Sequence, residues 1–306
     1  VGIGEAVRTM AKDIQRRHVL QGENALPGMP SGWGRLDWYI GGWVPKTLVV
    51  VKAGTGHGKT AFALSAMVKA ALRCHNDRTA PNVGSVAIIS LEMECATMAL
   101  RYVANVGSVN AQSLRLATVT NEEIDSIVRA TQAASHLDDI FRLVYRPGLS
   151  VNALARLVRR LQRRPGVPPL RLLVIDYLQL LSAPGCGNNR QQEIAQISAA
   201  LTLIAKREGL CVMALSQMNA DGQARESRKI EQDADVVVTL KPADPENETP
   251  DTNAVYDMLV QKNRHGLTTG AGKWRMVFSK RFQRFHEIEA DNNENKPRNN
   301  WRGEEE

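Results

Sequence analysis

The chain has 306 residues, and its 39 Lys and Arg residues exceed its 32 Asp and Glu residues, which gives a formal net charge of +7. Hydrophobic residues make up 43% and charged residues 23% of the chain, a composition that excludes a wholly disordered protein. No apolar run reaches the roughly 18–20 residues that cross a bilayer, which argues against a membrane-spanning segment. The mild positive charge permits a nucleic-acid partner without establishing one.

Cysteine spacing argues against a zinc site. The four cysteines lie far apart, with no C-x-x-C pair and no paired histidines. This usage favours a reduced, cytoplasmic setting. The residues are Cys74, Cys95, Cys186 and Cys211.

Residues 3–18 predict a short helix, with Val7, Met10 and Ile14 on one face. Three apolar residues form a stripe too thin to hold a helix by itself, so the segment is either a frayed terminus or an arm that docks elsewhere. A Pro- and Gly-rich link over residues 26–32 separates it from the rest. Because the chain opens with Val1 rather than Met, we expect a fragment or a processed chain.

From residue 31 onward, apolar runs alternate with helical patterns. Continuous β-branched runs without polar alternation are typical of a parallel sheet that is covered on both faces. The predicted strands are Thr47–Val51, Ser85–Ser90, Leu170–Asp176, Leu210–Leu215 and Val236–Leu240. The predicted helices are Lys59–Leu72, Met93–Val106, Asn121–His136, Ser150–Arg164 and Arg190–Arg207. Three further strands, expected at an antiparallel C-terminal edge, are Ala254–Val260, Lys273–Phe278 and Arg281–Ile288. These elements predict an α/β fold with a mostly parallel central sheet.

The strongest functional signal follows the first predicted strand and opens the first predicted helix. It fits the pattern G-x-x-x-x-G-K-[ST], with alanine in the first position. Glycines let backbone N–H groups surround phosphate oxygens, and the helix N-terminus adds positive potential. We expect Lys59 to reach the β- and γ-phosphates, Thr60 to hold Mg²⁺, and His57 to act as a spacer. The competing interpretation is a glycine-rich turn that matches by chance. The residues are Ala53, Gly54, Thr55, Gly56, His57, Gly58, Lys59 and Thr60.

Polar residues follow three other predicted strands. Asp176 ends a wholly apolar strand, as a residue that orients the metal does, and Glu92 follows another strand, where a general base is expected. Gln217 ends a third strand and is a candidate sensor of the γ-phosphate. Ligands bind beyond the carboxyl ends of parallel strands, so these side chains should converge with the phosphate loop. No N-K-x-D motif follows a strand, which favours ATP over GTP as the nucleotide.

The motifs taken together resemble the C-terminal motor domain of DnaB-type replicative DNA helicases, a RecA-like P-loop ATPase. The resemblance runs from about residue 30 to about residue 287 and implies three segments. These are a linker helix with its link (1–30), one RecA-like ATPase domain (31–288) and a disordered polar tail (289–306). The motifs are Gly58-Lys59-Thr60, Ser90-Leu91-Glu92-Met93, Ile175–Leu180, Asn189–Ile194, Leu215–Asn219, Arg225-Glu226-Ser227, Ile230–Asp235 and Lys262–Gly266.

The resemblance implies a catalytic role for several positions. Lys59 and Thr60 bind phosphate and Mg²⁺, Asp176 holds the metal through water, Glu92 is the general base, and Gln217 senses the γ-phosphate. Lys262 and Arg264 match a basic pair that is delivered in trans to a neighbour's nucleotide, so hydrolysis should depend on assembly into a ring, by analogy a hexamer. Without the resemblance, this pair would be interpreted as a solvated basic turn.

The resemblance also implies contacts to single-stranded DNA, by Arg190, Arg225 and Glu226. In this region the sequence departs from the family pattern at two places. The stretch 220–224 is shorter than usual, and Arg228 and Lys229 replace small residues, so they are expected to contact phosphates as well. A primase or a helicase loader is a further expected partner. The residues assigned to DNA are Arg190, Arg225, Glu226, Arg228 and Lys229.

A separate feature is an arginine-rich stretch. Between Arg142 and Ile175 the chain has eight arginines and no acidic residue. On the predicted helix over 150–164 the arginines occupy the faces away from the apolar stripe, which indicates either a solvated face or a contact with DNA phosphates or an acidic neighbour.

We therefore predict an ATP-dependent DNA helicase motor that acts in DNA replication. Two alternatives stay open. One is a RecA/RadA-like recombination ATPase, which would bind DNA without unwinding it. The other is a nucleotide-switched assembly module, whose hydrolysis single-stranded DNA would not stimulate.

Overall fold

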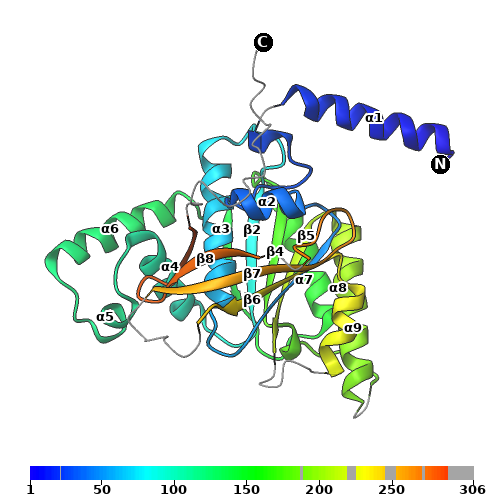
Figure 1. Cartoon of the computed structure of the whole chain (residues 1–306). Coiled ribbons are helices and arrows are strands. Elements are labelled where there is room, and N and C mark those ends of the chain that lie inside the picture. Colours follow the sequence, from blue (N-terminus) through cyan, green and yellow to red (C-terminus); the bar gives the residue numbers. More distant parts are fainter. Residues whose placement is uncertain (21, 187–188, 219–224, 245–252, 271–272, 289–306) are drawn as a thin grey trace.

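One nine-stranded sheet organises the part of the chain that this computed structural model describes, which is residues 1–20, 22–186, 189–218, 225–244, 253–270 and 273–288. The strand order is β3-β2-β4-β5-β1-β6-β7-β8-β9 (Figure 1). Strands β1 to β6 are parallel, and β7, β8 and β9 continue the sheet in antiparallel register. The predicted fold class is thereby confirmed.

The strands agree closely with the predicted apolar runs, with one addition. The apolar runs do not predict β3, because its half-buried sequence Phe-Arg-Leu-Val-Tyr lies at the sheet edge and lacks a continuous apolar stretch. The parallel strands are β1 (Leu48–Ala53), β2 (Ser85–Ser90), β3 (Phe141–Tyr145), β4 (Leu170–Asp176), β5 (Cys211–Gln217) and β6 (Val236–Pro242). The antiparallel strands are β7 (Asn253–Asn263), β8 (Trp274–Ser279) and β9 (Arg284–Glu287).

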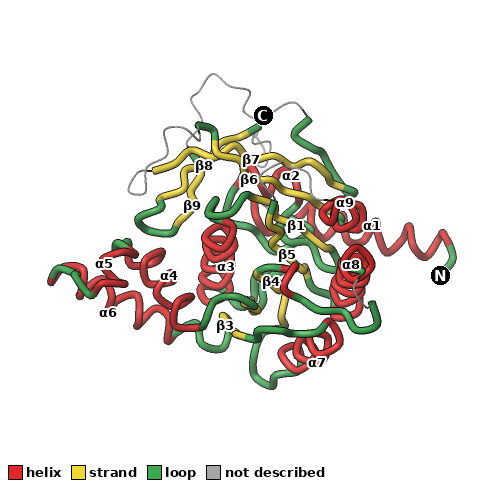
Figure 2. The backbone as a smooth tube through the Cα atoms, turned by 90° about the horizontal axis from the view of Figure 1, so that it is seen from below, coloured by secondary structure: helices red, strands yellow, loops and turns green. Residues whose placement is uncertain are grey.

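Helices cover both faces of the sheet (Figure 2). Helix α3 (Lys59–Asn76) packs on one face, and α7 (Val151–Gln162), α8 (Arg190–Glu208) and α9 (Arg225–Asp233) lie on the other. The remaining helices are α1 (Ile3–Val19), α2 (Gly34–Ile40), α4 (Cys95–Gly107), α5 (Ala111–Leu116), α6 (Asn121–Ser135) and the short turns Gly22–Ala25 and Leu178–Leu180. The sequence pattern does not predict α2, α5 and α9, because helices of 7, 6 and 9 residues are too short for a repeated apolar spacing to stand out.

Helix α1 confirms the helix predicted over residues 3–18, and none of its residues is buried. Val7, Met10 and Ile14 are all exposed in the chain by itself. Figure 1 shows α1 extending away from the sheet. The predicted tail, residues 289–306, lies outside the described residues, and the three-segment division stays a prediction. Among the described residues, no helix is both long and apolar enough to pass through a membrane.

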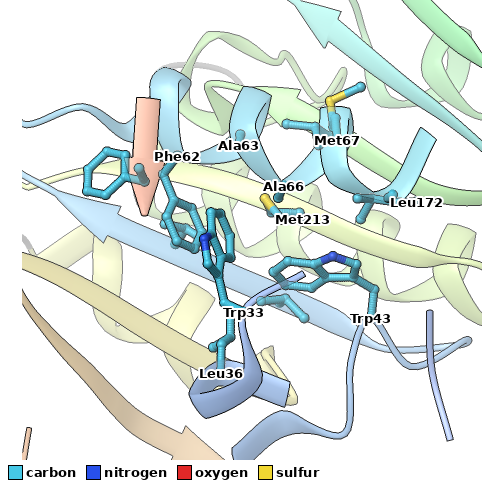
Figure 3. Close-up of a cluster of buried hydrophobic side chains, with 14 of the residues drawn as sticks. Trp33, Leu36, Trp43, Phe62, Ala63, Ala66, Met67, Leu172 and Met213 are labelled. Carbon is cyan, nitrogen blue, oxygen red and sulfur yellow. The ribbon is translucent and has the colours of Figure 1, made fainter. Parts of the chain in front are cut away.

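The central strands are buried on both sides, as the apolar runs predict. Along β1, Val49 and Val51 face one hydrophobic cluster, and Leu48 and Val50 face the other. The first cluster contains Trp33, Trp43 and Phe62, all within 1% of complete burial; the Trp33 and Phe62 rings stack with centroids 4.8 Å apart (Figure 3). Burial of apolar surface is the dominant favourable contribution to folding, and each of these large rings adds a large buried area. The predicted phosphate loop therefore follows a strand that is held rigidly on both sides.

Candidate nucleotide site

The predicted phosphate loop connects β1 to α3, as expected. Gly58 is the N-cap of α3 with φ of 73°, a left-handed conformation that only glycine adopts without strain. A Cβ at this position would lie 2.9 Å from the Phe285 ring and 3.0 Å from the Phe278 ring. Those rings stack on each other with centroids 4.6 Å apart and are buried, so they have little room to yield. Gly58 is therefore required by conformation and by space.

The Lys59 ammonium lies within the loop. Its Nζ donates hydrogen bonds to the carbonyl oxygens of Ala53, at 3.0 Å, and Gly54, at 2.8 Å. Burial lowers the pKa of Lys59, and the negative charges of Asp176 and Glu92 oppose that shift. A bound phosphate would add the negative charge that this partly desolvated cation lacks.

Thr60 and Asp176 meet at the base of the loop. Thr60 Oγ1 donates a hydrogen bond of 2.8 Å to Asp176 Oδ2. Asp176 is 3% exposed, and burial raises the pKa of its carboxyl group, although the Thr60 hydrogen bond and the Arg101 charge lower it. A hydroxyl and a carboxylate oxygen are the donors that Mg²⁺ prefers, so this pair fits the predicted metal site.

Glu92 and Asp176 lie on the same side of the sheet as Lys59. Strands β2 and β4 are neighbours, and the Leu91 amide donates to the Asp176 carbonyl oxygen at 2.8 Å, which places Glu92 beside Asp176. All three side chains line one cavity of about 1270 Å³ at the carboxyl edge of the strands. Glu92 and Asp176 therefore converge on the phosphate loop, as the strand order predicts. The other lining residues include Thr55, Thr60, Arg101, Arg115, Tyr177 and Gln217.

Arg101 is a site residue that sequence reasoning missed. It projects from α4 into the cavity, and its charge interacts with Asp176 and Glu92. Burial lowers the pKa of the Arg101 guanidinium, and the two carboxylates oppose the shift. Nothing in the local sequence of a mid-helix arginine signals this position; only its place on the helix that follows Glu92 offers a hint.

Gln217 reaches from β5 to the phosphate loop, as the sensor prediction requires. Its Nε2 donates to Thr55 Oγ1 at 2.6 Å. Gln179, to which the sequence assigned no role, donates through Nε2 to Ser216 Oγ at 3.1 Å and to the Gln217 carbonyl oxygen at 3.2 Å. A chain of hydrogen bonds therefore runs from the loop through Gln217 to Gln179.

Arg190 extends that chain at the start of α8. Its Nη2 donates to the Gln179 carbonyl oxygen at 2.6 Å, and its Nη1 pairs with Glu193 Oε2 at 2.6 Å. The guanidinium is thus held by its own chain, so its predicted DNA contact stays a prediction.

Lys262 and Arg264 lie close to the end of α9. Neither is among the described residues that line the nucleotide cavity. Lys262 Nζ donates to the carbonyl oxygens of Glu231, at 2.8 Å, and Gln232, at 2.7 Å. Arg264 Nη2 donates to the same Gln232 oxygen at 2.9 Å, and its Nη1 lies 3.2 Å from Asp235 Oδ1. Both cations therefore cap α9 within their own chain rather than reach their own phosphate loop.

The remaining predicted DNA contacts are only partly placed. Lys229 is exposed on α9 and pairs with Asp233 at 3.0 Å. The shortened stretch 220–224 lies outside the described residues. The backbone of α9 begins at Arg225, and the side chains of Arg225, Glu226 and Arg228 also lie outside the described part.

The loop, the buried carboxylate and the strand order define a P-loop nucleotide-binding α/β domain. The comparisons with known proteins narrow this class. Residues 28–287 match the family model described as the DnaB-like helicase C terminal domain, and the chain belongs to that family. It is related to ATP-hydrolysing replicative helicases.

Two curated relatives illustrate the similarity. The replicative DNA helicase DnaB of Geobacillus stearothermophilus and the replicative DNA helicase DnaC of Bacillus subtilis are each 31% identical to this chain over 293 residues. Each alignment covers 90% of this chain and 60% of the relative, so the chain spans about three fifths of their length.

Solved structures agree with the fold. A DnaB-like replicative helicase, described with its interactions with primase, aligns with a TM-score of 0.77 at 28% identity over 94% of this chain and 67% of its own. A second solved structure, described as an ATPase domain, aligns with a TM-score of 0.78 at 29% identity over 94% of this chain and 99% of its own. The resemblance predicted from the motifs is confirmed.

Proposed function

We propose that this chain is an ATP-driven motor that moves along single-stranded DNA and separates duplex DNA during replication. The observation that carries the proposal is the convergence of Lys59, Thr60, Glu92 and Asp176 on one cavity, with Thr60 and Asp176 already hydrogen-bonded at 2.8 Å. Membership of the DnaB-like helicase family supports the motor, and the roles of the site residues, the DNA substrate and the ring are part of this proposal.

The residues divide the work of phosphoryl transfer. Backbone N–H groups of the loop and the Lys59 ammonium hold the β- and γ-phosphates. Thr60 and Asp176 would hold Mg²⁺, which neutralises charge on the phosphate oxygens when it is bound. Glu92, exposed in the cavity beside Asp176, orients the attacking water and accepts its proton.

Release of the γ-phosphate is sensed through Gln217. Its hydrogen bond to Thr55 connects the loop to the end of β5, where the chain continues into residues 219–224. A change in loop contacts between the ATP and ADP states would thereby pass along the chain beyond β5 to the residues expected to contact DNA, and the difference in contacts between the two states is the only source of movement.

The basic pair is proposed to complete a neighbour's site. Lys262 and Arg264 lie outside this chain's own cavity, and Arg264 is 44% exposed at its side chain, so a second copy can meet it. A cation supplied in trans spreads transition-state charge and is worth roughly 10³–10⁵ in rate. Hydrolysis would then need a closed ring, by analogy a hexamer, and a primase or a loader is a candidate partner.

Mixing variants tests the shared site. Lys59→Ala and Arg264→Ala should each hydrolyse ATP far more slowly than the wild type, with and without single-stranded DNA. In an equal mixture, about a quarter of head-to-tail interfaces combine an intact loop with an intact Arg264, so activity should partly return. Lys241→Ala, which removes an exposed cation on β6, is the control and should leave activity unchanged.

Failure of the mixture to regain activity would contradict the shared site. The alternatives are decided by two further readouts. A recombination-type ATPase would show DNA-stimulated hydrolysis without unwinding of a forked duplex, and an assembly module would show no stimulation by single-stranded DNA.

A further inference from the structure

Helix α7 presents a stripe of exposed arginines. Arg156, Arg159, Arg160 and Arg163 follow the spacing i, i+3, i+4, i+7, which places them on one face over about 10 Å of helix. The opposite face, with Leu154 and Val158, is buried against the sheet. The four guanidiniums therefore project together into solvent.

Within the described residues, this stripe has no acidic partner. All eight cations between Arg142 and Arg171 are arginines, and none of them forms a salt bridge in the described part of the chain. Burial lowers the pKa of Arg142, and the charge of Arg164 adds to that shift, whereas Asp138 and Asp139 oppose it; these two acids therefore lie near Arg142 and not along the stripe on α7. Among nearby acids, Asp139 already pairs with Arg78 at 2.8 Å.

The stripe is remote from the nucleotide. Helix α7 starts near the carboxyl edge of the strands, where the Val151 amide donates to the Ser182 carbonyl oxygen at 3.0 Å. It ends at the other edge, where Gln162 Nε2 donates to the carbonyl oxygens of Glu208, at 2.8 Å, and Leu170, at 3.2 Å. No α7 residue lines the nucleotide cavity, and α7 lies across the molecule from the β8–β9 strands (Figure 2).

Helix stability does not account for the stripe. Arginines in the last turn are favoured by the helix dipole, but Arg156 lies in the middle of α7. Like charges at i and i+4, as in the pairs Arg156–Arg160 and Arg159–Arg163, destabilise a helix. An anionic partner lying against the stripe would turn this repulsion into attraction.

From these observations we infer that the α7 stripe is a second nucleic-acid surface, which binds the phosphate backbone of duplex DNA. Arginine forks grip phosphate oxygens in a bidentate manner, which suits an all-arginine surface. Helix α7 has no aromatic residue on which bases of a single strand could stack. Duplex DNA also presents one charge per about 1.7 Å of axis, twice the density of one strand, so the stripe meets more phosphates there.

Two neighbouring cations extend the surface. Lys206 and Arg207 lie in the last turn of α8, which the Gln162–Glu208 hydrogen bond places beside the end of α7, and Lys206 is exposed. A duplex lying along α7 would pass over them. In the proposed motor, this surface would hold the duplex on the side of the domain away from the nucleotide.

The test is the salt dependence of duplex binding in the whole chain without nucleotide. A short labelled duplex and a single strand of equal length are titrated between about 50 and 200 mM salt. The variant Arg156→Gln, Arg159→Gln, Arg160→Gln, Arg163→Gln should flatten the slope of log K against log salt by about 3 to 4 for the duplex, since each lost phosphate contact removes ~0.9. Its basal ATPase rate should be unchanged, which checks folding.

A matched control separates this surface from net charge. The variant Arg8→Gln, Lys12→Gln, Arg129→Gln, Lys241→Gln also removes four exposed cations and should change the duplex slope by less than one contact. The inference is wrong if both variants lose the same slope, if neither does, or if the single strand loses as much as the duplex. It is also wrong if the α7 variant loses binding to polyglutamate while duplex binding stays intact. Because no nucleotide is present, the result stands apart from the proposed ATPase mechanism.

Discussion

A partly buried ion pair connects the phosphate-loop strand to α9, and the cost of breaking it depends on which partner is removed. Lys52 lies one residue before the loop, and its Nζ is 2.7 Å from Glu231 Oε1 on α9. The Lys52 side chain is 10% exposed, whereas that of Glu231 is 32% exposed. The two partners should therefore respond unequally to removal of the other.

Glu231→Gln leaves the ammonium buried without its counter-charge. Breaking a buried pair costs about 3–5 kcal/mol, and the partial exposure of Glu231 reduces this to about 2 kcal/mol. Lys52→Met leaves a carboxylate that water already reaches, so we expect a loss of about 1 kcal/mol in the free energy of unfolding. The double variant should lose no more than Lys52→Met alone, which gives a coupling energy of about 2 kcal/mol.

The assay is urea unfolding at pH 7 without nucleotide and at one protein concentration, since assembly shifts apparent stability. Asp233→Asn is the matched control, because it removes the acid of another pair, 3.0 Å long, on the same helix, and the lysine left behind is exposed, with Lys229 at 49% against 10% for Lys52. Its cost should be under about 0.5 kcal/mol. Equal effects of Glu231→Gln and Lys52→Met, adding up in the double variant, would refute the reasoning.

Three further predictions concern the loop, the C-terminal strand and the cavity. Gly58→Ala should lower the free energy of unfolding by more than the roughly 1–2 kcal/mol cost of a left-handed alanine, and it should abolish nucleotide binding. Thermal unfolding and titration with a fluorescent nucleotide measure the two effects. The control Gly166→Ala, at a position with φ of 70° and open space around it, should show the conformational cost alone. Burial raises the pKa of Glu287 in the folded state, so the stability that this residue contributes falls as the pH rises from the ordinary pKa of a glutamate to the raised pKa. Glu287→Gln should therefore flatten the dependence of the urea-unfolding free energy on pH across that range. A pH dependence equal to that of the wild type would contradict this prediction. Arg101→Met should lower ATP turnover at least about tenfold with ADP affinity nearly unchanged, because Arg101 lines the cavity and its charge interacts with Glu92 and Asp176. An equal loss of ADP affinity would contradict a role for Arg101 in hydrolysis.

The patterns that correctly predicted elements of the fold were apolar runs and motif spacing, which depend on residues close together in the sequence. The predicted strands Leu170–Asp176 and Ser85–Ser90 contain the apolar runs Leu172–Ile175 and Val86–Ile89, and both are strands with the predicted bounds. The spacing of the phosphate-loop motif predicted the strand before it and the helix after it. The rule that the carboxyl ends of parallel strands share one edge of the sheet predicted that the carboxylates lie beside the loop. The apolar pattern did not predict strand β3, because a half-buried edge strand needs no continuous apolar run.

The sequence by itself determined the parallel core, the phosphate loop and the carboxylates that should face it, since motif spacing and hydrophobic period report directly on backbone geometry. Only the tertiary structure decided which remote side chains join them. Arg101 enters the cavity because of how α4 leaves β2, and Gln179 bonds to Gln217 because β4 and β5 are adjacent. Lys52 pairs with Glu231 across a separation of 179 positions. Such contacts depend on the packing of whole elements, which no local pattern encodes.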